Sequence, residues 1–291
     1  MQGAAGAGLT FVGAVLVMLA LNAPQGGEAA PGDARAQIGE ARAGQLTVAL
    51  PDALTDVRLT EAKAPGRPIV LLDPGHGGRD PGAPAVSGAI SEKQLTLMMA
   101  RELRDLLAKR GRVRVALTRD DDRYLTLDQR ADLAGRVGAS LYVSLHMDSA
   151  PNPMARGATV YSLSDVASDA EAARFASREN AAGGPATVGG NGSVEAMLAD
   201  LTLREQMNAS ANLAVRMVRK ASARVLLRPE PHRFAAFHVL RRAQVPAVLF
   251  EAGYVSNADD EVSLTSPAGR APIVAALADA IESDVASRVA R

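Results

Sequence analysis

Four ionisable side chains lie where chemistry is expected, although they are far apart in this 291-residue chain. His76 follows an apolar run in the loop DPGHGG, and Glu92 begins a helical pattern after that loop. His146 ends the run SLYVSL, and Glu251 ends the run PAVLF. Two imidazoles and two carboxylates are what a catalytic zinc site requires, because three ligands hold the ion, a fourth position admits water, and a separate carboxylate acts as base.

Each of these residues also has a structural interpretation. A histidine in a glycine-rich turn is often a surface residue, and a glutamate in the first turn of a helix offsets the helix dipole by about 0.3–1 kcal/mol. The glycines around His76 could instead form a phosphate-binding loop, but HGGRDPG lacks the Gly-Lys-Ser/Thr ending of a P-loop. The coincidence of four such positions favours the metal site.

The amino-acid composition limits which metal ligands, nucleophiles and partners are possible. The chain has no cysteine and four histidines, so zinc ribbons, iron–sulfur clusters and thiol nucleophiles are excluded. Lys and Arg (32) balance Asp and Glu (32), and aromatic residues make up only 3% of the chain, which argues against nucleic acid as a partner. Any metal site must therefore use His, Asp and Glu.

The N-terminal segment resembles a secretory signal. An apolar run of 13 residues, from Leu9 to Leu21, is too short for a comfortable membrane span and has the length of a signal core. Ala34-Arg35-Ala36 offers a cleavage site, although no basic residue precedes the run, so an apolar tail or an uncleaved anchor is the alternative. We expect a signal peptide over residues 1–36 and a linker over 37–66, in which the alternating stretch 45–50 could add one strand.

From Arg67 onward, short apolar runs alternate with helical periodicity. This pattern predicts a single α/β catalytic domain over residues 67–291, with a mixed, mostly parallel central sheet flanked by helices on both faces. Capping boxes at Ser91 and Thr126 open two of the helices. The strands are expected at 68–72, 113–118, 140–145, 157–163, 237–240 and 247–251, and the other helices at about 168–180, 194–223 and beyond Asn257.

Eight motifs then follow one another in order to the C-terminus. They are IVLLDPGHGGRDPGA, SEKQLTL, LTRDDDRYLTLDQRADLAG, YVSLHMDSAP, GATVYSL, SREN, FHVLR and PAVLFEAGYVSN. Together they resemble the zinc-dependent N-acetylmuramoyl-L-alanine amidases of bacterial cell walls, of the type that separates cells in Gram-negative bacteria. The resemblance implies that His76, Glu92 and His146 bind one zinc ion and that Glu251 is the catalytic acid/base.

Arg119, Arg130 and Asn180 also match family positions. Asp73 or Asp148 could orient the ligand histidines, although Asp73 could equally cap its own turn. Arg119 and Arg130 are expected to be structural, with Arg119 paired to the run Asp120–Asp122 and Arg130 to Asp128 or Asp132. We expect His232 and His238 to be structural as well, with His238 on a strand.

Residues 181–206 are predicted to be a flexible, glycine-rich insertion that could hold a regulatory helix. The resemblance implies a helix that covers the zinc until an activator protein, of the LytM type, withdraws it. Glu195 is then the best candidate to occupy the open zinc position, with an ordinary solvent-facing glutamate as the alternative.

The resemblance implies a periplasmic peptidoglycan hydrolase that cleaves the amide between N-acetylmuramic acid and the L-alanine of the stem peptide during daughter-cell separation. We expect a monomer without a stable membrane span after signal cleavage. A different zinc peptidase or carboxypeptidase of the wall, or a non-catalytic wall-binding module, is the alternative.

Overall fold

The computed structural model describes residues 57–182 and 194–289, which belong to one compact unit. The expected signal peptide and the stretch 45–50 lie outside these residues, as do residues 183–193 of the predicted insertion. The domain boundaries at 36 and 66 therefore stay predictions. A short strand, β1 (Leu59–Thr60), lies within the segment expected to be a linker.

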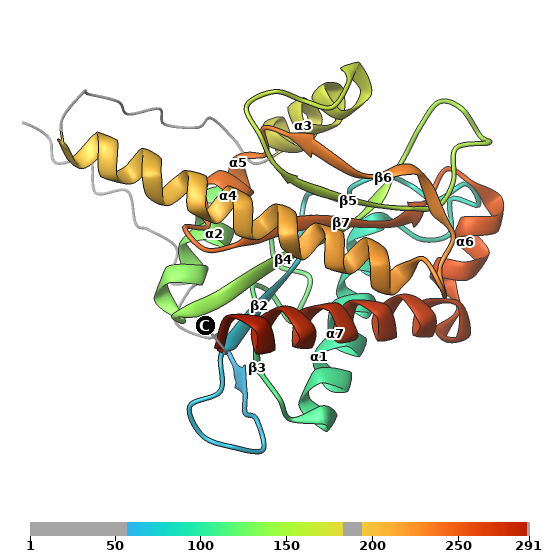
Figure 1. The fold of residues 1–291 in the computed structure, drawn as a ribbon. Helices are drawn as coiled ribbons and strands as arrows, with labels where there is room; N and C mark the ends of the chain where they lie inside the picture. Colours follow the sequence, from blue (N-terminus) through green and yellow to red (C-terminus); the bar gives the residue numbers. More distant parts are fainter. Residues whose placement is uncertain (1–56, 183–193, 290–291) are drawn as a thin grey trace, which may run out of the picture. The chain divides into compact units, whose positions relative to one another are not determined.

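The described residues form one seven-stranded sheet (Figure 1). Its order is β1-β3-β2-β4-β7-β5-β6, and the pairs β3–β2, β2–β4, β4–β7 and β5–β6 are parallel. The pairs β1–β3 and β7–β5 are antiparallel. The predicted mixed, mostly parallel sheet is confirmed. The strands beyond β1 are β2 (Ile69–Pro74), β3 (Arg114–Leu117), β4 (Ala139–Asp148), β5 (Ala158–Leu163), β6 (Leu227–Ala235) and β7 (Ala247–Tyr254).

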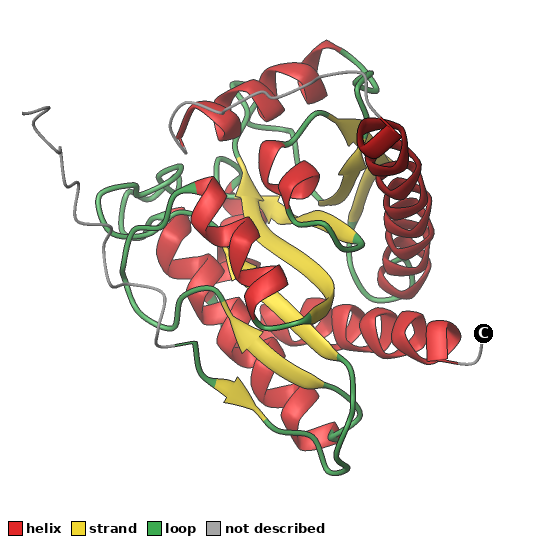
Figure 2. Ribbon diagram, turned by 90° about the vertical axis from the view of Figure 1, so that its left-hand side faces the viewer, coloured by secondary structure: helices red, strands yellow, loops and turns green. Residues whose placement is uncertain are grey.

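Helices cover both faces of the sheet, as Figure 2 shows. One face packs against α1 (Glu92–Arg110), α4 (Val194–Ala221), α6 (Ala258–Thr265) and α7 (Pro267–Val289). The other packs against α2 (Leu127–Arg136), α3 (Ala170–Ala182) and α5 (His238–Arg242). Each face has its own apolar cluster because alternate residues of a strand point to opposite sides. Val70 and Leu72 thus belong to the first cluster, and Leu71 to the second.

Helix boundaries follow the capping signals of the sequence. Ser91 and Gln94 form a reciprocal capping box at the start of α1, as Thr126 and Gln129 do at the start of α2. Gly111 ends α1 in the left-handed conformation with φ 71°, which glycine adopts without steric cost. These local signals make Glu92 the first residue of α1.

Two predictions beyond α4 were wrong. The segment Phe237–Leu240 is not a strand, because Phe237 is the N-cap of the short helix α5. The strand β6, which precedes it, was missed by the sequence pattern. Pro229 and Pro231 interrupt its alternation, and prolines are tolerated there because β6 is an edge strand that pairs only with β5.

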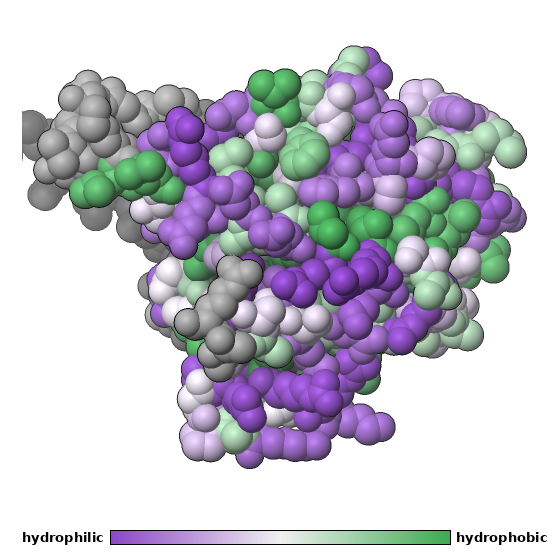
Figure 3. Space-filling view, in the orientation of Figure 1, coloured by the Kyte–Doolittle hydropathy of each residue, from purple (hydrophilic) through white to green (hydrophobic). Residues whose placement is uncertain are grey.

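Helix α4 is continuous from Val194 to Ala221. Its carboxyl half packs into the core through Leu213, Ala214 and Met217, whereas Leu198 and Leu201 are 59% and 63% exposed. Figure 3 shows hydrophobic side chains on the surface over this amino-terminal end. None of the described helices is long and apolar enough to span a membrane.

Candidate metal centre

The carboxyl ends of β2, β4 and β7 bring three of the four predicted residues together. His146 lies in β4 directly opposite Glu251 of β7, and Leu145 lies opposite Pro74, two residues before His76. Glu92 joins them from the first turn of α1. All four side chains are buried. The structure therefore places them at the edge of the sheet where parallel α/β folds carry their sites.

Glu92 lies between the two imidazoles. Its Oε1 is 3.0 Å from Nε2 of His76 and 3.0 Å from Nδ1 of His146. Two ligands 2.0–2.1 Å from a tetrahedral zinc ion are about 3.4 Å apart. The Glu92 oxygen is thus nearly as far from each imidazole nitrogen as two ligands of one zinc ion would be.

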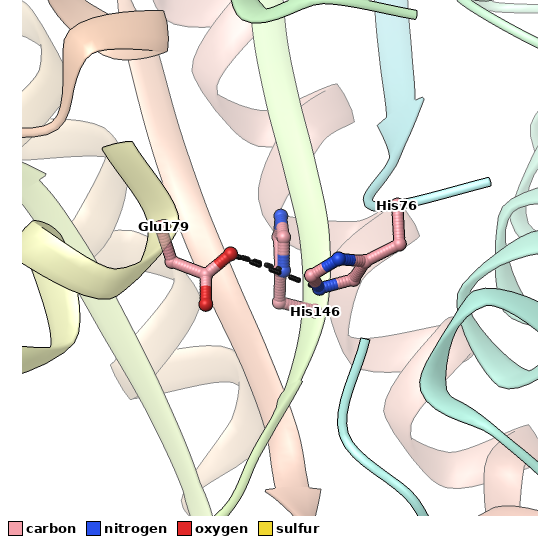
Figure 4. A group of neighbouring side chains, drawn as sticks. All are labelled: His76, His146 and Glu179. Atoms are coloured by element: carbon pink, nitrogen blue, oxygen red, sulfur yellow. Dashed lines mark ion pairs between the residues drawn. The ribbon is translucent and has the colours of Figure 1, made fainter. Parts of the chain in front are cut away.

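A fourth residue, Glu179 of α3, completes the group. Its Oε2 lies 3.7 Å from Nε2 of His76 and 3.6 Å from Nδ1 of His146 (Figure 4). These three residues form a cluster that could hold a metal ion. Glu179 was not among the predicted site residues, although it belongs to the motif SREN. Its helix approaches from the face opposite α1, which no local pattern reveals.

Glu195, the predicted occupant of the open zinc position, lies in the first turn of α4, and its side chain is outside the described part of the structure. Further along α4, the side chain of Gln206 donates to the carbonyl of Gln244, just before the amino end of β7. The role of Glu195 stays a prediction. Among the described side chains, Glu179 is the one that lies in the position expected for Glu195.

The charges at the centre favour a bound cation. Burial by itself lowers the pKa of His76, but the carboxylates of Glu92, Asp80 and Glu179 outweigh it and raise the pKa to about 10. Nε2 of His76 is buried without a hydrogen-bond partner among the described residues, although the Glu92 oxygen is close. The donor set of two imidazoles and two carboxylates fits zinc.

Asp80 orients the first histidine. Its Oδ2 lies 2.9 Å from Nδ1 of His76, which leaves Nε2 to face Glu92 and the centre. The prediction that Asp73 or Asp148 orients the histidines is not supported by the contacts. Asp73 accepts hydrogen bonds from Thr118, Tyr142, Ser144 and Arg130, and Asp148 from the backbone of Ser149 and from Tyr254.

Two buried arginines hold the loop that carries His76. Arg130 pairs with Asp73 at 2.8 Å and donates to the carbonyls of Pro74 and His76, so its predicted pairing with Asp128 or Asp132 was wrong. Burial raises and Arg130 lowers the pKa of Asp73, with a net value of about 2.

Arg119 is structural, as expected, but through backbone carbonyls. It donates to the carbonyls of Pro74, Gly75, Lys93 and Asp121, the last being its one contact in the predicted acidic run.

Glu251 differs from the other carboxylates at the centre. It is fully buried, and neither carboxylate oxygen has a hydrogen-bond partner among the described residues. Burial, followed by the negative charges of Asp148, Glu92 and Glu179, holds its pKa well above the ordinary value. A carboxyl group in such surroundings is suited to take up and release protons.

The loop around His76 has an unusual backbone. His76 itself has φ 61°, a left-handed conformation that costs energy in a residue with a β-carbon. Its neighbours approach closely, because a β-carbon on Gly75 would lie 2.3–2.7 Å from the ring of His146. The imidazole of His146 therefore occupies space that only a glycine at position 75 leaves open.

We expect Gly75→Ala to displace His146 and to lower zinc affinity by about tenfold or more. Calorimetric titration with zinc measures this affinity. Gly135→Ala in α2 is the matched control, since a β-carbon there meets no atom within 4 Å. Equal zinc affinities for the two folded variants would contradict the tight packing described here.

The remaining histidines lie away from the centre. Nε2 of His232, in β6, is 2.9 Å from the hydroxyl of Ser162. Nε2 of His238, in α5, is 2.8 Å from Asp128. Both contacts fit the predicted structural role, although His238 begins a helix and not a strand.

Known proteins share this sequence and fold. Residues 70–283 match a family described as N-acetylmuramoyl-L-alanine amidase. The amidase AmiA of Escherichia coli (strain K12) is 33% identical over 223 residues, which cover 75% of this chain and 76% of AmiA. AmiC of Neisseria meningitidis serogroup B is 32% identical over 220 residues, which cover 74% of this chain and 52% of AmiC.

Among solved structures, the catalytic domain of the amidase CwlV from Bacillus (Paenibacillus) polymyxa var. colistinus has a TM-score of 0.55 and 25% identity. The match covers 74% of this chain and 97% of that domain. AmiC2 of Nostoc punctiforme has a TM-score of 0.52 and 25% identity, and covers 78% of this chain and 99% of its own. The predicted α/β fold is thus that of amidase catalytic domains.

Proposed function

Because the chain belongs to the N-acetylmuramoyl-L-alanine amidase family, we propose that it is a zinc enzyme that cleaves the amide between N-acetylmuramic acid and the L-alanine of the peptidoglycan stem. The observation that carries the proposal is the contact of Glu92 with both imidazoles, beside a Glu251 carboxyl group that has no hydrogen-bond partner in the described part of the chain. A wall-binding module would have no use for this buried acid.

The ligand atoms follow from the contacts. Asp80 holds Nδ1 of His76, so Nε2 is the atom available to zinc. His146 turns its Nδ1 toward Glu92, so that atom would be the second ligand and the Glu92 carboxylate would be the third. Bound zinc would supply Lewis acidity that polarises the amide carbonyl and a nearby water.

Glu251 moves the protons of the reaction. As a carboxylate it takes a proton from the attacking water, and as a carboxylic acid it gives that proton to the leaving amine of L-alanine. Its burial excludes bulk water, which keeps the proton available for the amine. A bound divalent cation offsets the negative charges of Glu92 and Glu179 that raise its pKa.

Glu179 gives the centre a closed form. If His76, His146 and Glu92 were to hold zinc, the Glu179 carboxylate, which lies 3.7 Å and 3.6 Å from the two imidazole nitrogens, could supply a fourth ligand and so keep water and substrate out. We therefore assign to Glu179 the blocking role that the sequence suggested for Glu195. Opening the site requires a movement of α3, and an activator of the LytM type that binds the protein could drive it.

The cellular setting is part of the same proposal. A signal peptide over residues 1–36 would deliver the enzyme to the periplasm, where peptidoglycan is its substrate. Daughter-cell separation is the proposed role, with the enzyme acting as a monomer.

One assay tests the proposed reaction. Purified protein is incubated with zinc and peptidoglycan sacculi, and the products are examined for free stem peptides with an L-alanine amino terminus. Removal of zinc by a chelator should abolish their release, and added zinc should restore it. Peptides cut at internal bonds would indicate a zinc peptidase instead, and the absence of any product would favour a binding module.

We expect Asp80→Asn to lower zinc affinity by roughly 10–100-fold, because the carboxylate that orients His76 is lost. Zinc titration of the purified protein measures the change. Asp122→Asn is a matched control, since Asp122 bonds the same loop through the backbone of Gly78 without a contact to either histidine. An unchanged zinc affinity in Asp80→Asn would show that His76 can bind zinc without a carboxylate to orient it.

A further inference from the structure

A cavity of about 500 Å³ opens beside the metal centre. It lies between α3 and the loop that follows β4, and Asp148, two residues beyond His146, forms part of its wall. Three arginines line it, Arg174 and Arg178 from α3 and Arg228 from β6, together with two carboxyl groups, of which Glu171 pairs with Arg228 and Asp148 has a pKa raised by burial to about 6. A cavity with this many guanidinium groups next to a reaction centre is suited to an anionic part of a ligand.

The three arginines differ in what they already bind. Arg228 donates to both carboxylate oxygens of Glu171 and to the hydroxyl of Tyr254, so its donors are engaged. Arg174 is exposed and has no ion pair or hydrogen bond among the described residues. Arg178 is half-exposed, its Nε lies 3.2 Å from Oε1 of Glu179, and its guanidinium donates a long hydrogen bond of 3.5 Å to the carbonyl of Ser149. Arg174 and Arg178 therefore have guanidinium donors that can turn to a ligand.

The two arginines point to the same side of α3. They are four residues apart, which places their side chains one above the other on a helix. The guanidinium of Arg178 lies 5.0 Å from the ring centre of Phe175, which limits its movement. Arg174 and Arg178 thus form a pair of donors along one wall of the cavity.

The distance from the metal centre sets the length of the ligand. Nε of Arg178 is 3.2 Å from one oxygen of Glu179, and the other oxygen of Glu179 is 3.7 Å from Nε2 of His76. The guanidinium is therefore within about 10 Å of the centre, a span of two to three extended residues. The L-alanine supplies the leaving amine, so the residue after it reaches the cavity.

We propose that this cavity is a subsite in which Arg174 and Arg178 bind a carboxylate on the second residue of the stem peptide. The proposal rests on the proposed function and adds a requirement about the substrate. The enzyme distinguishes a stem whose second residue carries a free carboxylate from one in which that group is a carboxamide. A carboxamide keeps the shape but loses the charge-assisted hydrogen bonds to the guanidinium groups.

Two ligands that differ only in this group test the subsite. They are N-acetylmuramoyl-L-alanyl-glycine, which ends in a carboxylate, and its carboxamide. Calorimetric titrations use the full-length, zinc-loaded protein carrying Glu179→Gln, which removes the proposed blocking carboxylate, together with Glu251→Gln, so that neither ligand is hydrolysed. We expect the carboxylate to bind about tenfold more tightly than the carboxamide.

Arg174→Gln in the same background should remove most of this preference, and Arg174→Gln with Arg178→Gln should abolish it. Binding of the carboxamide should stay within about twofold in Arg174→Gln. The control is Arg204→Gln on α4, whose arginine pairs only with Asp200 among the described residues. It should keep the full preference.

Three outcomes would overturn the subsite. They are equal affinity for the two ligands, failure of both ligands to bind, and a preference for the carboxylate that survives in the double variant. Hydrolysis of sacculi by the parent enzyme, measured in parallel, separates the two proposals. An enzyme that releases stem peptides but shows no preference for the carboxylate contradicts the subsite and leaves the proposed function standing.

Discussion

Glu251→Gln should lower kcat for the release of stem peptides by about 10³-fold, within the range that general acid–base groups contribute. Glutamine fills the same buried space but cannot take a proton from water or return it to the leaving amine. The measurement is the initial rate of product formation from sacculi at saturating zinc. Zinc affinity should change by no more than a few fold, because Glu251 is not a ligand in the proposed mechanism.

A matched variant tests whether the loss is specific. Glu282→Gln alters another buried carboxyl group, in α7, which pairs with Arg110 and Arg112 away from the metal centre. Its kcat should equal that of the parent, even if its stability falls. Full hydrolysis by Glu251→Gln would rule out the proposed acid/base.

Glu92→Gln and Glu179→Gln should have opposite effects, although both glutamates lie against the same two histidines. Loss of the Glu92 carboxylate removes a ligand, so zinc affinity and activity should fall by about 100-fold or more. Loss of the Glu179 carboxylate removes the group that blocks the open position. Basal activity on sacculi should then rise, by about tenfold, with little change in the coordination by the other three residues.

Zinc titration and product release, measured on both variants, distinguish these roles. If Glu179→Gln loses zinc and activity as Glu92→Gln does, then Glu179 is a required ligand and not a blocking group. If Glu179→Gln behaves as the parent does, deletion of residues 183–203 becomes the next test, because Glu195 would then be the remaining candidate. A rise in basal activity after that deletion would support Glu195.

Much of the fold could be predicted because the signals were local. Capping boxes at Ser91 and Thr126, the left-handed Gly111 and the buried apolar runs each depend on a few neighbouring residues. Edge strand β6 was the exception. Its pairing with β5 stabilises a sequence that local preferences would not assign to a strand.

The sequence by itself determined the chemistry of the centre. With no cysteine and four histidines, a metal at this centre would have to be bound by imidazoles and carboxylates, and the ends of apolar runs and the start of a helix indicated which ones. His76, His146 and Glu251 meet because parallel strands end at the same edge of the sheet, and Glu92 joins them from the first turn of α1. This rule allows residues that are far apart in the sequence to be predicted as neighbours in the structure.

Only the tertiary structure decided which other side chains reach the centre. Asp80 and not Asp73 holds His76, since the turn after β2 folds back on itself while Asp73 faces Arg130 and Tyr142. Glu179 and the two arginines of α3 reach the site because that helix packs against the sheet from the face opposite α1. Such contacts depend on how separate elements pack, and a side chain's neighbours across a packing interface leave no periodic signal in its own segment.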